Sequence, residues 1–218
     1  MTGVQTCALP IYRLLLGAFV DAHVLGIYAI ASLLVGAVAG LLNKLYVFVS
    51  LPALSEIARS SPSRLRGVYN RLSLPGDLVL VFMAGLLFAA GQWVIDLLYD
   101  PRYAEAGAML QILALSLFAV RYEIARQVYL ALGLPQYGTV LSLVRFVALY
   151  SLVPSLYFLG GTQAAIWVVA LHGLAAAPFV YGFNAKLGLN DFRRELLVIL
   201  IALPAGFLCG SALKLLYV

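Results

Sequence analysis

Four charged side chains stand in parts of the chain that are otherwise apolar. Arg121, Glu123 and Arg126 lie in one such stretch, and Arg145 lies in the next. Glu123 and Arg126 are three residues apart, so on a helix they share a face and can form an ion pair. Guanidinium groups bind phosphate in a bidentate manner, and the three arginines outnumber the glutamate. An excess of two positive charges predicts a site for an anionic substrate such as a diphosphate. The alternative is an internal network that only holds helices together.

The composition indicates what kind of protein carries these charges. The chain has 218 residues, of which 64% are hydrophobic and 11% are charged. Soluble domains average about 45–50% apolar and about 25% charged residues. The difference excludes a soluble enzyme, a disordered tail and a nucleic-acid-binding domain. In membrane proteins an excess of positive charge, here a net +5, usually marks cytoplasmic loops. We therefore expect an all-α polytopic membrane protein.

Common motifs for chemistry at a fixed active site are absent from the sequence. It contains no G-x-S-x-G, H-E-x-x-H, P-loop or C-x-x-C pattern. Two cysteines provide neither a disulfide framework nor the spacing of metal ligands. We therefore expect a protein that is not an enzyme, with no catalytic residues, no cofactor and no metal.

The apolar stretches predict about six membrane-spanning helices. A span needs about 20 mostly apolar residues, and the uncharged stretch 146–185 is too long for one, so Gly160 and Gly161 are expected to divide it. A tight turn at 133–135 joins two spans as a hairpin. The hairpin places Arg145 opposite residue 125, roughly 15 Å from the turn at about 1.5 Å per residue. The predicted spans lie near 24–50, 76–98, 104–132, 137–158, 163–186 and 195–217.

The loops between these spans differ in charge. Four arginines cluster in the loop at 59–71 and three basic residues flank the loop at 186–194, so both loops are expected in the cytoplasm. The loop at 96–105 has a net charge of −2 and fits the opposite side. The alternation of six spans agrees with all three assignments. It also places Val218 outside, which suggests that a further helix follows.

Further residues of interest lie in or near the spans. Lys44 either extends to the cytoplasmic interface or faces a cavity, and it joins the four residues above as a candidate for the substrate path. Asp77 is expected at the interface. His172, alone in the fifth span, is predicted to be a hydrogen-bonded packing residue, with a proton relay as the alternative. Gly36 and Gly40 form a G-xxx-G pair, a pattern found where helices pack closely.

The first eleven residues need a different explanation. Residues 1–11 match the in-frame translation of a sequencing-library adapter whose first codon, GTG, is read as Met. The alternative, a natural N-terminus or a signal peptide, lacks a basic region and a long apolar region. We therefore expect that residues 1–11 are not native and that 12–218 form a helical membrane lobe.

Five short motifs occur in a recognisable order along residues 13–218. They are Arg13–Gly17 (R-L-L-L-G), Leu25–Ala31 (L-G-I-Y-A-I-A), Leu51–Ser55 (L-P-A-L-S), Ile95–Ala106 (I-D-L-L-Y-D-P-R-Y-A-E-A) and Leu130–Gly133 (L-A-L-G). Their order, and its agreement with the predicted topology, resembles that of Wzx-type polysaccharide flippases. These proteins belong to the multidrug/oligosaccharidyl-lipid/polysaccharide exporter superfamily. The chain departs from the family pattern at Tyr12, where the family has Asp before the arginine.

This resemblance implies a fold and a function. It implies 12 to 14 spans in two lobes around a central cavity, with this chain as most of the C-terminal lobe. The implied activity moves an undecaprenyl-diphosphate-linked glycan from the inner to the outer leaflet of the bacterial plasma (inner) membrane by alternating access. The implied partners are the lipid-linked glycan, membrane lipids and a missing N-terminal lobe, without which the fragment is expected to be inactive. The alternatives are a multidrug or cation antiporter of the same superfamily and a membrane-embedded glycan polymerase or transferase.

Overall fold

The computed structural model describes residues 16–17 and 19–215, apart from the side chain of Pro62, so the predicted non-native segment 1–11 lies outside the described residues. Every regular element in the described part is helical, which confirms the all-α prediction. The elements are α2 (Ala22–Leu45), η1 (Tyr46–Ser50), α3 (Leu51–Ser60), η2 (Pro62–Arg64), α4 (Leu65–Leu98), η3 (Pro101–Tyr103), α5 (Glu105–Ala114), α6 (Leu117–Val120), α7 (Glu123–Ala131), α8 (Pro135–Leu171), η4 (His172–Ala176), α9 (Ala177–Lys186) and α10 (Phe192–Leu215).

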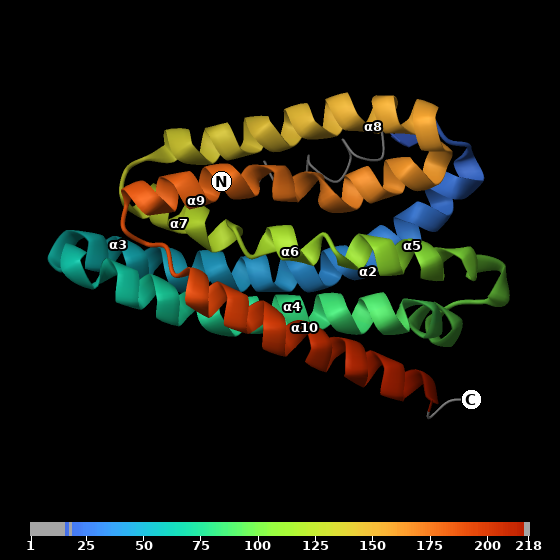
Figure 1. Ribbon diagram of the computed structural model, residues 1–218, viewed down its shortest axis with the longest axis horizontal. Helices are drawn as coiled ribbons and strands as arrows, with labels where there is room; N and C mark the ends of the chain where they lie inside the picture. Colours follow the sequence, from blue (N-terminus) through green and yellow to red (C-terminus); the bar gives the residue numbers. More distant parts are fainter. Residues whose placement is uncertain (1–15, 18, 216–218) are drawn as a thin grey trace.

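Five continuous helical segments among the described residues are long and apolar enough to cross a membrane. One of them, Pro135–Lys186, has 52 residues, which is more than one crossing requires. Its Gly161 has φ 67° and ψ −160°, a backbone conformation that glycine adopts readily. Figure 1 shows the chain turning back there, so that the second half of α8 returns beside the first half. The predicted break at Gly160–Gly161 is confirmed.

Two helix ends at the same end of the bundle use one capping motif. Gly133 follows α7 with φ 73°, and Gly188 follows α9 with φ 68°. After each glycine the next backbone N–H donates to a carbonyl five residues back, Leu134 to Tyr129 and Leu189 to Asn184, both at 2.8 Å. This is the Schellman arrangement, which satisfies carbonyl groups that a helix end leaves without partners. Gly133 and Gly188 therefore end α7 and α9 at the points where the chain turns.

The basic loops meet at that end. Leu54, Leu65, Val128 and Leu189 form one buried cluster that joins α3, α4, α7 and the loop after α9. The Arg66 guanidinium also donates to the carbonyl oxygen of Asn190 at 2.9 Å. The two loops predicted to face the cytoplasm therefore lie together, and the acidic loop at 96–105 lies at the far end of α4. The orientation in a membrane stays a prediction.

The first and second predicted spans differ from the structure at their polar ends. The helix that begins at Ala22 continues through η1 and α3 to Ser60, and α4 begins at Leu65 rather than near 76. Asp21 starts the first of these helices, because its Oδ1 accepts a hydrogen bond from the backbone N–H of Val24 at 2.8 Å. A span predicted from the length of an apolar stretch ends where charged residues begin. The helices themselves continue, because Leu54 and Leu65 are buried beyond that point.

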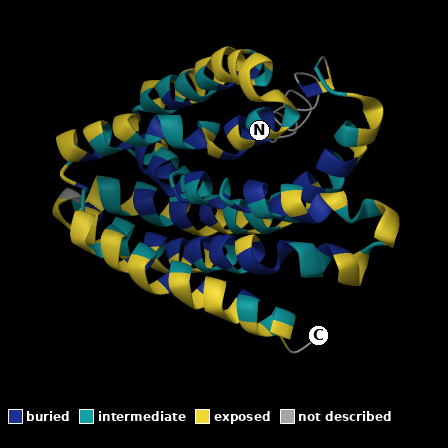
Figure 2. Ribbon diagram, turned by 45° about the vertical axis from the view of Figure 1, so that its right-hand side comes forward, coloured by how far each residue is buried: buried dark blue, intermediate teal, exposed yellow. Residues whose placement is uncertain are grey.

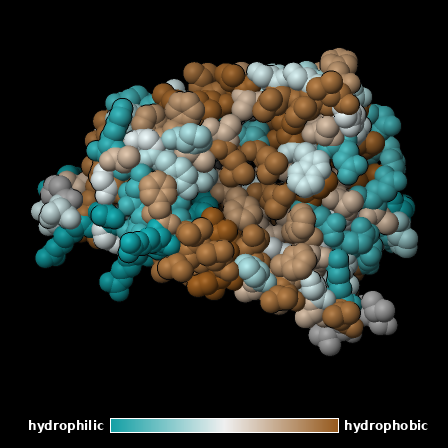
Figure 3. Space-filling model, in the orientation of Figure 1, coloured by the Kyte–Doolittle hydropathy of each residue, from teal (hydrophilic) through white to brown (hydrophobic). Residues whose placement is uncertain are grey.

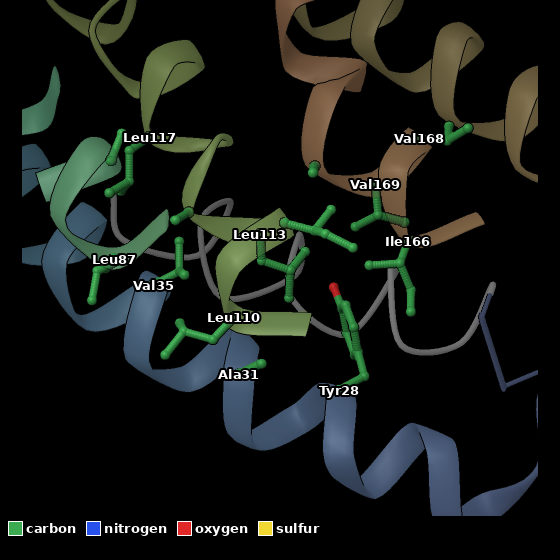
Figure 4. Packing of buried hydrophobic residues seen from close by; sticks show 14 of the residues in the cluster. Tyr28, Ala31, Val35, Leu87, Leu110, Leu113, Leu117, Ile166, Val168 and Val169 are labelled. Carbon is green, nitrogen blue, oxygen red and sulfur yellow. The ribbon is translucent and has the colours of Figure 1, made fainter. Parts of the chain in front are cut away.

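The main core lies where α2, α4, α5, α6 and both halves of α8 meet. Figure 4 shows Ala31 and Val35 of α2 packing toward Leu110 and Leu113 of α5, with Val169 of α8 on the opposite side. Figure 2 places the buried residues between the helices and the exposed residues around the outside. Buried packing is therefore concentrated inside the bundle, as in other helical membrane proteins.

The outside of the bundle is strongly apolar along its middle. Figure 3 shows hydrophobic residues across the centre of one face and hydrophilic residues toward the two ends. On α10 the exposed large apolar residues are Phe192, Leu196, Leu197, Leu200, Ile201, Phe207, Leu208 and Leu215. Such a surface would be costly in water and suits a lipid environment.

Glycines allow α10 to approach α4 closely. A methyl group at Gly206 would collide with the carbonyl oxygen of Phe82, and one at Gly210 would lie 2.7 Å from the carbonyl oxygen of Leu86. By contrast, a methyl group at Gly36 or Gly40 would meet no atom within 4 Å. The G-xxx-G pair singled out in the sequence is therefore not a packing contact among the described residues. The helix contact uses Gly206 and Gly210 instead.

Replacing Gly206 with alanine is expected to destabilise the protein by about 1–3 kcal/mol, the usual cost of inserting a methyl group into a packed contact. Because the colliding atom belongs to the backbone of α4, it cannot move aside as a flexible side chain would. The measurement is thermal unfolding of the purified variant in detergent. Gly40→Ala is the matched control and should unfold no earlier than the parent, since alanine favours helix and meets open space. Equal melting temperatures for both variants would contradict the close α4–α10 contact.

Candidate functional site

Two of the five continuous helical segments change their hydrogen-bond pattern near the centre of the bundle, and we call these short stretches interruptions. Turns at Leu115–Ser116 and Arg121–Tyr122 divide the segment 105–131 into α5, α6 and α7. The short 3-10 segment η4 separates α8 from α9, and Pro178 in the first turn of α9 lacks the N–H that a continuous helix would use. A methyl group at Gly173 would lie 2.5 Å from the Cβ of Ala119, so the two interruptions touch. In membranes, interrupted helices occur where the backbone lines a cavity or lies buried in protein.

Both interruptions line one cavity of about 240 Å³. Its walls come from α2, α5, α6, both halves of α8 and η4, and α7 contributes Glu123. On α2 the small residues Ser32, Gly36 and Ala39 form part of the wall, which explains the open space beside Gly36. Figure 4 shows Tyr28 extending from α2 toward Leu113 and Val169, which also line this cavity. Pockets for whole small molecules usually measure about 300–1,000 Å³, so this cavity fits part of a large ligand.

Glu123 and Arg145 bring opposite charges to the cavity wall. The Arg145 Nη1 donates to Glu123 Oε1 at 2.7 Å, and the other carboxylate oxygen of Glu123 lies 3.1 Å from Arg126 Nη1. These ion pairs confirm two predictions, that Glu123 and Arg126 pair on one helix face and that the hairpin brings Arg145 to their depth. Nε and Nη2 of Arg145 are buried and have no hydrogen-bond partner in the described part of the chain. The group of three carries a net charge of +1.

Arg121 does not belong to this group. Its side chain is 4% exposed, with Nε 3.6 Å from Asp77 Oδ1 and Nη2 3.5 Å from Glu195 Oε2. Residues two apart on a helical path point to different sides, so Arg121 and Glu123 face different neighbours. The predicted excess of two positive charges is therefore wrong, because Arg121 is neutralised elsewhere and the cluster at the cavity retains a single excess charge.

Asp77, Arg121, Arg194 and Glu195 form a second, neutral charge network. Arg194 Nη2 lies 2.9 Å from Asp77 Oδ2, and Arg194 also donates to the carbonyl oxygen of Asn70 at 2.8 Å and to Ser73. Asp77 is 4% exposed, because α10 and the α6–α7 turn cover it, so its side chain faces the inside of the bundle. Its depth in a membrane, expected near the interface, stays a prediction.

The charge network of Asp77, Arg121, Arg194 and Glu195 has little free space. The adjoining cavity measures about 10 Å³, which is room for about one water molecule. Tyr181 of α9 donates to the Glu195 carboxylate, so the network connects α4, the α6–α7 turn, α9 and α10. It has no room for a substrate. For Arg121, the geometry fits the alternative of an internal network that holds helices together.

Lys44 and His172 have different surroundings. Lys44 is exposed on α2 and lines neither of the two cavities described above. His172 lies at the cavity wall, with Nδ1 2.7 Å from the carbonyl oxygen of Val169, which agrees with a hydrogen-bonded packing residue. The cavity also includes Ser32 and Ser116, which the sequence analysis did not single out. The sequence does not distinguish these two serines from others, because isolated serines are common in membrane helices.

The comparisons with known proteins address the first half of the chain. The model of a family described as "Polysaccharide biosynthesis protein" matches residues 3–108. This range includes α2, α3, α4 and the beginning of α5, and it includes Asp77 but not Glu123 or Arg145. No curated protein and no solved structure matches the chain. The predicted family resemblance is thereby confirmed: over its first half, this multi-pass membrane chain has the sequence pattern of the polysaccharide biosynthesis proteins.

Proposed function

We propose that the chain is the C-terminal lobe of a flippase for lipid-linked oligosaccharide or polysaccharide precursors. The flippase would move them from the inner to the outer leaflet of the bacterial inner membrane by alternating access. One observation carries the proposal: a cavity inside a membrane bundle is lined by Arg145, two of whose nitrogens have no partner in the described structure. The family match to polysaccharide biosynthesis proteins supplies the class of substrate.

The chemistry of the cavity suits the part of such a substrate where lipid meets diphosphate. Arginine binds phosphate oxygens through parallel N–H groups, and a net charge of +1 among Glu123, Arg126 and Arg145 favours an anion. Apolar walls from Val35, Leu113 and other residues suit the adjoining lipid chain. A volume of about 240 Å³ is too small for an oligosaccharide as well, so the glycan would extend into a larger path outside this cavity.

The alternatives fit the cavity less well. A cation-coupled antiporter needs a carboxylate that a cation can reach, and Glu123 at this cavity is already paired with two arginines. A glycan polymerase or transferase needs acid and base groups on a sizeable outer loop. The acidic loop between α4 and α5 is short, and its Asp100 pairs with Arg102 on the surface. A flippase therefore accounts best for the position of the charges.

The proposal is tested by transport in cells. The full-length natural gene that encodes this chain is expressed in bacteria that lack their own flippase but still synthesise the lipid-linked precursor. Restored surface glycan is the expected result, measured by antibody binding to intact cells. If the protein reaches the membrane and the precursor still accumulates at the inner leaflet, the proposal is wrong. If precursor elongation changes without any change in its leaflet, a polymerase is favoured instead.

A further inference from the structure

Glu123 occupies a special position between two arginines. Its two carboxylate oxygens have different partners, Arg145 at 2.7 Å and Arg126 at 3.1 Å. Arg145 and Glu123 line the cavity, whereas Arg126 lies beside Gly138 of α8 and is about one-third exposed. The Glu123 carboxylate therefore accepts a hydrogen bond from Nη1 of Arg145, which lines the cavity. Arg126 is a second cation within reach of the same carboxylate.

We propose that Glu123 is a displaceable counterion. It holds Arg145 while the cavity is empty and remains with Arg126 alone when an anionic group of the substrate reaches Arg145. The proposal rests on the proposed function, and it adds a positioning residue that regulates how tightly the anion is bound. The ligand chemistry is a phosphate or diphosphate with an apolar chain attached.

The geometry allows this exchange without leaving a charge unpaired. A buried carboxylate that loses its only partner is strongly disfavoured, but Glu123 keeps Arg126 three residues along the same helix. Arg145 likewise exchanges one anion for another, and its Nε and Nη2 are still unpartnered among the described residues. Released from Glu123, the guanidinium can turn and offer a pair of N–H groups to phosphate oxygens.

The local backbone also favours movement of Glu123. Glu123 is the first residue of α7, and it directly follows the turn at Arg121–Tyr122, where the backbone N–H of Tyr122 donates to the carbonyl oxygen of Ala119, three residues back. The first N–H groups of a helix have no partner within the helix, so a small rotation there breaks few backbone hydrogen bonds. Arg121, in that turn, is fixed by Asp77 and Glu195. We therefore expect the exchange to involve Glu123 and the start of α7 and to leave Arg121 in place.

A displaceable counterion gives a transporter moderate affinity. A path must bind its substrate well enough for entry and weakly enough for departure. Because the substrate anion must displace Glu123, part of its binding free energy is offset, and the returning carboxylate assists release. Removal of the carboxylate should therefore strengthen binding and slow release.

The experiment measures the affinity of the purified full-length protein for farnesyl diphosphate in lipid nanodiscs. Glu123→Gln is expected to bind this probe about ten-fold more tightly, which corresponds to about 1.4 kcal/mol. Arg126→Ala is expected to weaken binding, because Glu123 then has Arg145 as its remaining partner. Glu105→Gln removes an equal charge from an exposed site in the acidic loop, outside the cavity, and should change nothing. Inorganic diphosphate and farnesol show whether the anion or the chain dominates.

The double variant Glu123→Gln/Arg126→Ala separates the exchange from simple attraction. If Arg126 acts through Glu123, its removal has no effect once the carboxylate is gone, and the double variant binds like Glu123→Gln. Equal weakening by Arg126→Ala in both backgrounds would overturn the proposal, because Arg126 would then attract the anion directly. If Glu123→Gln does not fold, unchanged affinity in Arg126→Ala overturns it equally.

The same measurements distinguish this proposal from the function on which it rests. If Arg145→Ala abolishes binding and Glu123→Gln does not strengthen it, the anion site stands and the displaceable counterion is wrong. If Arg145→Ala leaves the affinity for farnesyl diphosphate unchanged, this cavity is not the anion site of the proposed function. Tighter binding in Glu123→Gln together with loss in Arg145→Ala supports both.

Discussion

Replacement of Asp77 by alanine is expected to remove most of the folded protein from the membrane. Asp77 balances Arg194 at 2.9 Å and Arg121 at 3.6 Å, and the Arg121 side chain is 4% exposed. Breaking a buried ion pair by removing one partner costs about 3–5 kcal/mol, because a charge remains buried without compensation. Total stabilities of domains are about 5–15 kcal/mol, so the loss is severe. The measurement is the amount of protein in the membrane and its thermal unfolding in detergent.

Asp100→Ala is the matched control for this prediction. Asp100 also pairs with an arginine at 3.0 Å, but both side chains are about two-thirds exposed, and surface ion pairs contribute about 0–1 kcal/mol. Asp77→Asn should fall between the two variants, since its amide oxygen still accepts a hydrogen bond from Arg194 but carries no charge. Normal membrane levels and normal unfolding of Asp77→Ala would show that the network of Asp77, Arg121, Arg194 and Glu195 contributes little to folding.

The helices and the ion pairs of Glu123 could be predicted from local sequence. Gly161 divides the long apolar stretch because a residue with φ 67° there favours glycine, and paired glycines mark such points. The contact of Arg145 with Glu123 follows from counting equally along two helices from the turn at Gly133. Both predictions depend on the regular rise of a helix, which the sequence reveals through its apolar pattern.

The network of Asp77, Arg121, Arg194 and Glu195 depends on tertiary structure. Asp77 and Arg194 are 117 residues apart, and no local spacing indicates that α10 lies against α4. Arg121 and Glu123 are two residues apart, so their spacing already places them on different sides of a helix, but it does not indicate that Asp77 and Glu195 are the partners of Arg121. Grouping the charges by their depth along the helix, without their direction around it, placed all three charges of that segment in a single cluster. The direction of each side chain gives Arg121 a structural position and leaves Glu123 at the cavity.

Replacement of Arg145 by alanine is expected to reduce export of the glycan at least ten-fold while the protein stays in the membrane. The change removes the cation at the cavity wall, and hydrogen bonds to charged groups contribute about 1.5–3 kcal/mol each. Folding should tolerate the change, because Glu123 keeps its ion pair with Arg126 at 3.1 Å. Export is measured as surface glycan in the cells described above, and the membrane level is measured in the same culture.

Two further variants determine what part of the Arg145 side chain matters. Arg145→Lys keeps the charge but not the planar pair of N–H groups, so it should retain part of the export if phosphate is bound in a bidentate manner. Arg102→Ala removes an arginine that is about 71% exposed and pairs with a surface carboxylate, and it should export normally. Full export by Arg145→Ala would contradict an anion site at this cavity. Full export by Arg145→Lys would mean that a point charge suffices there, so that the two unpartnered nitrogens of Arg145 would not need to act together on one phosphate group.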